Sequence, residues 1–597
     1  MSQWLLSPTP FLGDSFLSII TTTSLWCALA SVAIIVLYCL RMFYQIYRNY
    51  SLVKHIPGSW QVAFAPFHIP LISPICNYSD VRGVLNCAKK IGDSENGIFR
   101  MSMVAQNMVW LMGADYIKQA TVSLGHNIGK PQHYEIFDIF GENIVSAKNT
   151  ESWKKHHKAC SPAFSTRNLE YVVQVSNDTA QMLLERWFRK MQQHPNEEEE
   201  KENASNFGKL STNSESSSSS NSKTPLSNVL PPNSVLFDGN EMAEVTMNVL
   251  LNAGYGLTKT ALFSDSERKK HVLSEEEKSQ GEEFLHHMEV ALARALILRR
   301  FVDEHEHPWL YQWLLKYTGI EKGLKATEQV LDQIIADRKK EFGITISSLS
   351  TNEEKEQFFD SDLEKKDLLS LLVKANLRDQ LLTDQEMKSN AFVVLLAGYE
   401  TTASTLQWLI YELAKNSDVQ RKCQDEIERL LENGTKTFTY DMYHDFQYLN
   451  AVIMETLRVH CPTFQVDKVV LNKNVRIGKY DIPKGTHVNI HIMGLNLNEN
   501  YWENANKFDP ERFATKELKE QAQNQGTWIP FSFGNRRCIG FKFAQFEIIS
   551  VLIQLLKECN FTLLNDETVD PVIEQMGLTL KPANLKVAIT RRRTQQQ

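Results

Sequence analysis

The sequence predicts a mainly α-helical protein, and three observations support this. The run from Lys388 to Leu413 is long and largely apolar, which is typical of a helix buried in a core. A loop that ends at Cys538 leads directly into another apolar, helix-like segment. Further helical patterns occur at residues 241–251, 282–298 and 312–342. The 597 residues are 43% hydrophobic, so the chain can bury a large core around these helices.

The charge and the cysteines exclude several classes of protein. The net charge is −7, and this mild acidity argues against nucleic acid as a partner. The nine cysteines are scattered and include no C-x-x-C pair. This favours a reducing compartment over a disulfide framework or a zinc cluster.

The N-terminal part of the chain predicts a single membrane anchor. Residues 15–40 contain no charged side chain, and the run is long enough to span a bilayer as a helix. Arg41, Arg48 and Lys54 follow it, and positive charge on this side places the rest of the chain in the cytosol. A cleaved signal peptide is less favoured, because no positive segment precedes the run.

The predicted organisation is one large domain behind this anchor. Residues 1–14 form an N-terminal segment, 15–40 the anchor, 41–58 a basic linker, 59–592 the domain and 593–597 a tail. Two polar stretches interrupt the domain, at about 193–234 and 347–366. The first contains four consecutive glutamates and a run of five serines. Low hydrophobicity predicts that both are disordered surface insertions.

The loop from Phe531 to Gly540 contains the most specific chemistry. Its two glycines allow sharp turns, and the N-terminus of the following helix favours a thiolate at Cys538. Arg536 and Arg537 add positive charge and planar donors suited to carboxylates. Such a thiolate suits a haem, which brings an iron and two acidic propionates. The alternative is a buried structural cysteine, the more common role of a lone thiol.

The spacing F-x-x-G-x-R-x-C-x-G makes this loop resemble the cysteine-ligand loop of the cytochrome P450 family. The match is complete at Phe531, Gly534, Arg536, Cys538 and Gly540. The resemblance implies a mainly α fold with small β-sheets that encloses haem b between two central helices. It also implies that Cys538 is the iron ligand and that Phe531 and Arg536 contact the haem. The anchor indicates the membrane-anchored microsomal type found in eukaryotes.

A second motif lies in the long apolar run. Ala397, Gly398 and Thr401 share one helical face, where small side chains let a flat ligand approach the backbone. Glu400 is costly in such a helix unless it has a partner or a role. The pattern A-G-x-E-T-T resembles the family's helix on the distal side of the haem. This implies that Ala397 and Gly398 contact the haem and that Glu400 and Thr401 deliver protons. In the alternative, Thr401 bonds to its own helix and Glu400 reaches the surface.

Other positions match the family with changes. The segment of Trp153 resembles the helix that contacts a propionate, but His157 stands where the family usually has Arg and need not be charged. Lys468 replaces another propionate-binding Arg and lacks its bidentate fork. The E-x-x-R and P-E-R-F motifs imply a charged clamp behind the cysteine loop, made by Glu455, Arg458 and Arg512. Residues 134–144, 392–396, 463–466 and 576–579 are expected to line the substrate pocket.

The function implied by the resemblance is monooxygenation at the endoplasmic reticulum membrane. One atom of O₂ would enter an apolar small molecule, such as a lipid, sterol, terpenoid or xenobiotic. Electrons would come from NADPH through NADPH–cytochrome P450 reductase, and the resemblance also allows cytochrome b5 as a partner. Two alternatives stay open: a same-fold isomerase or dehydratase that acts on hydroperoxides without a reductase, and a non-catalytic membrane haem protein.

Overall fold

The computed structural model describes residues 13–60, 81–103, 106–148, 150–193, 230–257, 308–349 and 367–592, with positions 298, 351, 353, 354 and 358. Several predicted features lie outside these residues. They are the helix at 282–297, most of the two insertions, and the chain ends at 1–12 and 593–597.

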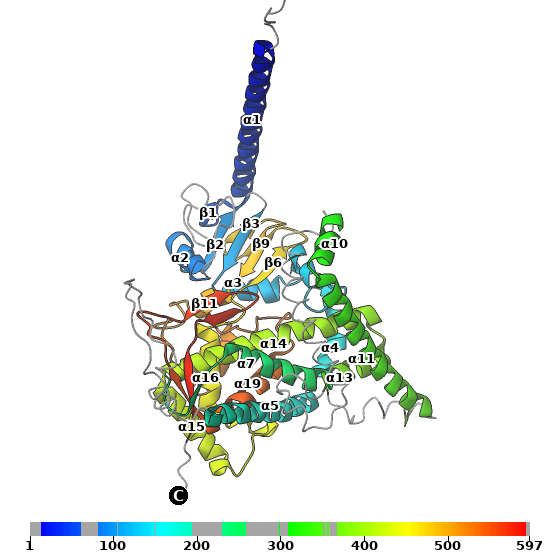
Figure 1. Cartoon of the computed structure of the whole chain (residues 1–597), viewed down its shortest axis with the longest axis vertical. Coiled ribbons are helices and arrows are strands. Elements are labelled where there is room, and N and C mark those ends of the chain that lie inside the picture. The colour runs from blue at the N-terminus through cyan, green and yellow to red at the C-terminus, as the bar shows by residue number, and fades with distance from the viewer. Residues whose placement is uncertain are drawn as a thin grey trace, which may run out of the picture.

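Helices form most of the described structure, as predicted (Figure 1). In chain order they are α1 (Gly13–Val53), α2 (Val81–Ile91), α3 (Ala114–Lys118), α4 (Thr150–Cys160), α5 (Thr166–Gln193), α7 (Gly239–Val249), α10 (Pro308–Tyr317), α11 (Ile320–Ser348), α13 (Leu368–Asp379), α14 (Asp384–Lys415), α15 (Ser417–Leu430), α16 (Gln447–Val459), α17 (Ile492–Asn496), α18 (Lys516–Gln525) and α19 (Phe541–Glu558).

The strands of the described residues form four small sheets. The largest has the order β1-β2-β3-β9-β6-β4 and lies between α1 and the helical body (Figure 1). The others are β10-β13-β5, the hairpin β11-β12 and the hairpin β7-β8. The bounds are β1 (Gly58–Trp60), β2 (Ile98–Ser102), β3 (Asn107–Leu111), β4 (Ile128–Gly129), β5 (Ser234–Leu236), β6 (Val466–Val470), β7 (Val475–Ile477), β8 (Tyr480–Ile482), β9 (His487–Ile490), β10 (Cys559–Leu563), β11 (Ile573–Met576), β12 (Leu580–Ala583) and β13 (Val587–Arg591).

The long apolar run forms α14, which passes through the middle of the helical body (Figure 1). A capping box fixes its start, since the Thr383 hydroxyl accepts from the Glu386 N–H and the Glu386 carboxylate accepts from the Thr383 N–H. Most of its side chains are buried in one core shared with α5, α16 and α19. An apolar helix of this length is stable in water only when surrounded in this way.

The N-terminal helix continues further than the predicted anchor. α1 ends at Val53 and not near Leu40, so most of the expected linker is helical. Its C-terminal end is docked on the largest sheet: Val53 is fully buried, and Asn49 donates a hydrogen bond to the carbonyl of Met103 (2.8 Å). Residues 29–53 are apolar enough to cross a membrane, and only 6% of the most apolar 18-residue window within them is buried in the protein.

Two smaller expectations differ from the structure. The helix predicted at 312–342 is divided into α10 and α11 by Gly319, whose φ of +74° is left-handed and ends the first helix. Cys87 in α2 is disulfide-bonded, which differs at this one position from the expectation of a reducing compartment.

Candidate functional site

The loop that carries Cys538 is shaped by its own backbone. The Cys538 N–H donates to the carbonyl of Phe531 (2.9 Å), and the Arg537 N–H donates to that of Gly534 (3.1 Å). Gly534 has a φ of +78°, and a Cβ there would lie 2.8 Å from the carbonyl oxygen of Thr121. Only glycine fits this turn, which places the thiol just before α19.

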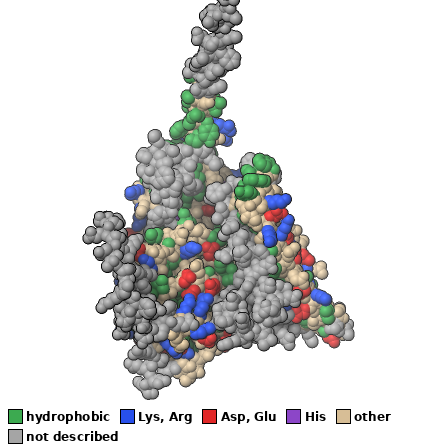
Figure 2. All heavy atoms as spheres, viewed as in Figure 1, with side chains coloured by type: hydrophobic (Ala, Val, Ile, Leu, Met, Phe, Trp, Pro, Cys, Tyr) green, Lys and Arg blue, Asp and Glu red, His purple; other side chains and the backbone are tan. Residues whose placement is uncertain are grey.

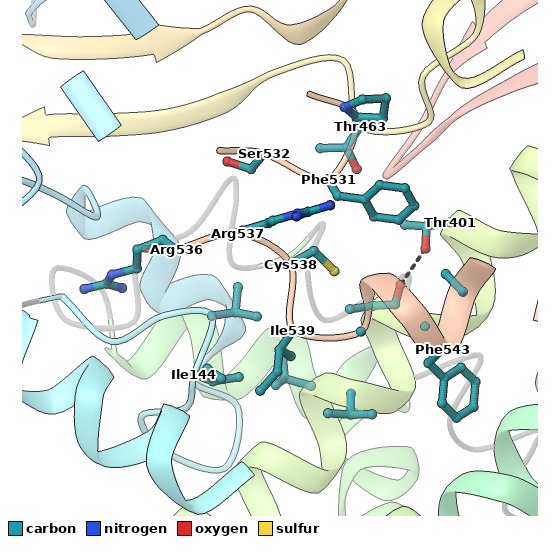
Figure 3. A pocket seen from close by; sticks show the side chains of 18 of the residues that line it. Ile144, Thr401, Thr463, Phe531, Ser532, Arg536, Arg537, Cys538, Ile539 and Phe543 are labelled. Carbon is teal, nitrogen blue, oxygen red and sulfur yellow. Dashed lines mark hydrogen bonds between the residues drawn. The ribbon is translucent and has the colours of Figure 1, made fainter. Parts of the chain in front are cut away.

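Cys538 faces a cavity of about 320 Å³ between this loop and α14. Figure 3 shows Cys538 near its centre, with Thr401 on one side and Arg536 on the other. Ala397 and Gly398 also line it from α14. Most other walls are apolar: Ile144, Val145, Leu250, Leu368, Val393, Val394, Val466, Ile492 and Phe531.

Three of the four segments predicted to line the pocket contribute to this cavity. They supply Ile144, Val393, Val394, Thr463 and Val466. Within the described part of the chain, residues 576–579 do not line it. They form the end of β11 and the turn to β12, where Met576 and Leu578 are exposed.

One edge of the cavity is positively charged. Lys130, Lys468 and Arg536 line it. β4 pairs with β6 so that Gly129 faces Val469, and the next residues in this antiparallel register are Lys130 and Lys468. Burial and the Arg536 charge lower the pKa of Lys468 to about 8, and burial with both neighbouring cations lowers the pKa of Lys130 well below its usual value. Like charges placed in this way repel, so the edge is suited to an anionic ligand.

Two aromatic side chains extend this edge. The Arg536 guanidinium lies 5.2 Å from the centre of the Trp153 ring, and its Nη1 donates to the carbonyl of Ala147 (2.6 Å). The Trp153 and His157 rings are 4.8 Å apart, and both residues line the cavity. Burial lowers the pKa of His157, which favours the neutral imidazole. His157 therefore offers a hydrogen bond to an anion, not a full charge.

The two residues predicted to deliver protons are placed differently. Thr401 lines the cavity, and its hydroxyl donates to the carbonyl of Ala397 (2.8 Å), one helical turn earlier. This is the back-bond expected of a threonine within a helix. Glu400 does not line the cavity; its Oε1 accepts a hydrogen bond from the Thr579 hydroxyl (3.2 Å). The structure thus brings Thr401 and Cys538 to one cavity and turns Glu400 towards the C-terminal hairpin.

Comparison with models of protein families assigns this chain to a family. A family model described as Cytochrome P450 matches residues 66–204 and 285–589, well over half of the chain. This chain belongs to the cytochrome P450 family. The family's cofactor is haem, and the matched range includes the Cys538 loop and α14.

Curated relatives match over shorter stretches. Cytochrome P450 3A29 of Sus scrofa is 32% identical over 235 residues, which cover 38% of this chain and 46% of the relative. Cytochrome P450 3A25 of Mus musculus is 37% identical over 215 residues, covering 35% and 41%. Cytochrome P450 3A19 of Capra hircus aegagrus is 34% identical over 205 residues, covering 34% and 92%. The chain spans less than half the length of the first two relatives.

The cavity of this P450 fits a haem on three grounds. Cys538 offers a thiol ligand inside it. The α14 wall presents the small residues Ala397 and Gly398 to the cavity. The cationic edge of Lys130, Lys468 and Arg536 matches two propionates, which would remove the repulsion between these side chains.

The thiolate expected at Cys538 is not favoured by the protein groups alone. Burial raises the pKa of the thiol, although the Gly540 N–H and the Arg537 charge act in the opposite direction. Among the protein groups alone, burial therefore acts on this thiol more strongly than the opposing Gly540 N–H and Arg537 charge, and the thiolate at Cys538 stays a prediction. A metal cation at Sγ would supply the missing positive charge and deprotonate the thiol.

The predicted clamp lies in the core of the P450. The Arg458 and Glu455 side chains are fully buried and form a bidentate pair, with Nε–Oε2 of 2.7 Å and Nη2–Oε1 of 2.8 Å. Arg458 also donates to the carbonyls of Asn496, Ala505 and Lys507. The Arg512 Nε lies 3.4 Å from Glu455 Oε1. These bonds join α16 to the segment that leads towards the cysteine loop.

Lys130 is the site residue that the sequence analysis missed. No motif surrounds it, and its strand β4 has only two residues. Its place at the cavity follows from pairing with β6, a segment more than three hundred positions later in the chain. A basic residue directly after a short strand was the only available signal, and that signal is too common to be specific.

Proposed function

We propose that this P450 is a membrane-bound haem-thiolate monooxygenase. The observation that carries the proposal is that Cys538 and Thr401 meet at one mainly apolar cavity with a cationic edge. A haem bound there supplies the activation of O₂, which protein side chains do not perform. The proposed net reaction is RH + O₂ + NADPH + H⁺ → ROH + H₂O + NADP⁺, where RH is an apolar substrate.

The residues around the proposed haem have distinct tasks. Cys538 would supply the thiolate ligand of its iron, and Phe531 would contact it from the same loop. Lys130, Lys468 and Arg536, with the Trp153 N–H, would bind the propionates and so hold the haem in the cavity.

The α14 side would manage protons and substrate. Ala397 and Gly398 line the α14 side of the cavity with small residues. Thr401 presents a hydroxyl inside the cavity, and Glu400, its neighbour, is the proposed source of protons. The aliphatic walls exclude bulk water and favour substrates such as lipids, sterols, terpenoids or apolar xenobiotics.

The proposed location is the endoplasmic reticulum membrane, with α1 as a single span and the domain in the cytosol. Arg41, Arg48 and Lys54 follow the uncharged run of residues 15–40, as the positive-inside rule requires. Trp309, Trp313 and Tyr317 are exposed on α10, which lies at the same end of the molecule as α1 (Figure 1). Figure 2 shows hydrophobic side chains gathered there. Trp and Tyr prefer the membrane–water interface, which supports this placement.

The proposed electron donors are NADPH–cytochrome P450 reductase and, as a second partner, cytochrome b5. The test uses the full chain in lipid nanodiscs with the reductase, NADPH and O₂. Apolar compounds are first screened for a spin-state shift in the haem spectrum, and positive compounds are then tested for hydroxylation.

The proposal expects product that depends on NADPH, the reductase and O₂ together. Turnover of a fatty-acid hydroperoxide without NADPH would instead identify an isomerase or dehydratase. No consumption of NADPH by a fully haem-loaded chain with any binding compound would identify a non-catalytic haem protein.

A further inference from the structure

The Glu400 carboxylate is held from outside its own helix. Its Oε1 accepts a hydrogen bond from the Thr579 hydroxyl at 3.2 Å. Among the described residues, no other hydrogen bond or ion pair reaches the Glu400 side chain. The orientation of this acid on an otherwise apolar part of α14 therefore depends on one hydroxyl group, supplied by the C-terminal hairpin.

Thr579 is itself firmly placed. Its side chain is 2% exposed, and it precedes β12 in the turn of the hairpin. The next residue, Leu580, accepts hydrogen bonds on its carbonyl from the Ser404 hydroxyl (2.6 Å) and the Trp408 indole (2.9 Å). Its N–H donates to the carbonyl of Pro462 (2.9 Å). The hairpin is thus attached to α14 one and two turns beyond Glu400, which fixes the distance between the hydroxyl and the acid.

We infer that Thr579 is a positioning residue for Glu400, so that the C-terminal hairpin determines how this acid delivers protons to the cavity. The inference rests on the proposed function and adds a residue to it. Glu400 lies just outside the cavity wall that its neighbour Thr401 forms, so its direction decides whether a proton reaches the cavity. A hydroxyl is both donor and acceptor, and so it can hold the carboxyl group in either protonation state.

The test compares three variants of the full chain in nanodiscs with the reductase. Thr579→Val removes the hydroxyl at nearly constant volume, Thr579→Ser keeps it, and Thr562→Val is a matched control at an exposed position of β10. Without added substrate, poor proton delivery diverts electrons into O₂ + NADPH + H⁺ → H₂O₂ + NADP⁺, whereas full reduction to two waters consumes two NADPH per O₂. The hydrogen peroxide released per NADPH should rise towards the equimolar limit in Thr579→Val only.

A second readout does not depend on turnover. The infrared carboxyl band of Glu400, identified as the band lost in Glu400→Gln, should shift in Thr579→Val and keep its position in Thr579→Ser and Thr562→Val. Haem content and the ferrous–CO spectrum should be unchanged in all three. If Thr579→Val loses haem, the smaller Thr579→Ala provides the same comparison.

The outcomes separate this inference from the proposed function. An unchanged infrared band and an unchanged peroxide ratio in a haem-loaded Thr579→Val or Thr579→Ala variant would show that the hydroxyl only fills space. If the wild-type chain consumes no NADPH, the proposed monooxygenase fails, while a shifted infrared band would still establish that Thr579 positions Glu400.

Discussion

The buried pair of Glu455 and Arg458 allows a prediction whose size follows from the structure. Glu455→Gln changes one charged oxygen into an amide and leaves the Arg458 guanidinium without its counter-charge. Both side chains are fully buried, so water cannot replace the lost partner. Breaking a buried ion pair from one side destabilises by about 3–5 kcal/mol. This is a large part of the roughly 5–15 kcal/mol that stabilises an ordinary folded protein.

The assay measures the urea unfolding of the full chain by its tryptophan fluorescence. Haem content is measured in parallel. Glu455→Gln should lower the unfolding midpoint strongly and reduce haem retention, because the pair joins α16 to the segment before the cysteine loop. The matched control is Glu520→Gln, which breaks the exposed pair with Lys516 on α18. An exposed pair contributes about 0–1 kcal/mol, so the control should be close to wild type.

A double variant tests the cause. Glu455→Leu with Arg458→Met removes both charges, and it should destabilise less than the sum of the two single changes, since no unpaired charge remains. Equal effects of Glu455→Gln and Glu520→Gln, or strict additivity in the double variant, would refute the reasoning that desolvated charge dominates at the clamp.

Four further predictions follow from the site. Cys538→Ser should lose the thiolate-type ferrous–CO band. Cys559→Ser changes a buried thiol away from the cavity and should keep the band. Survival of the band in a folded Cys538→Ser variant would contradict the assignment of Cys538 as the ligand. Thr401→Ala should keep haem and substrate binding but form less product per NADPH. The rate of product formation should fall by up to the factor of roughly 10²–10⁴ that general acid catalysis supplies. An unchanged ratio of product to NADPH would mean that Thr401 is only a helix residue. In the haem-free chain, Lys468 has a pKa of about 8, below the roughly 10.4 of an unfolded lysine, so the unfolded state binds more protons between these values. Lys468 should therefore add up to about 3 kcal/mol to the unfolding free energy from pH 8 to about pH 10.4, and Lys468→Met should remove this share while the share of Lys130 remains. Protease treatment of intact microsomes should digest the domain and spare α1, whereas full protection of the domain would place it on the lumenal side.

The sequence predicted those features of the structure that depend on residues close together in the chain. The cysteine loop and the start of α19 depend on contacts within about ten residues, such as the bond from the Cys538 N–H to Phe531. The buried character of α14 follows from its length and apolar composition, and the Glu455–Arg458 pair follows from one helical turn. Backbone geometry and helical spacing depend on neighbouring residues, so a short sequence motif is enough to predict them.

Only the tertiary structure showed which residues from other parts of the chain contact these motifs. Lys130 reaches the cavity because β4 pairs with β6, and Glu400 turns to Thr579 because the C-terminal hairpin docks on α14. The thiol pKa at Cys538 depends on how many protein atoms surround the sulfur, and the continuation of α1 to Val53 depends on docking against the sheet. Each of these outcomes comes from pairing, burial or charge between segments far apart in the chain, and sequence spacing does not encode such distances.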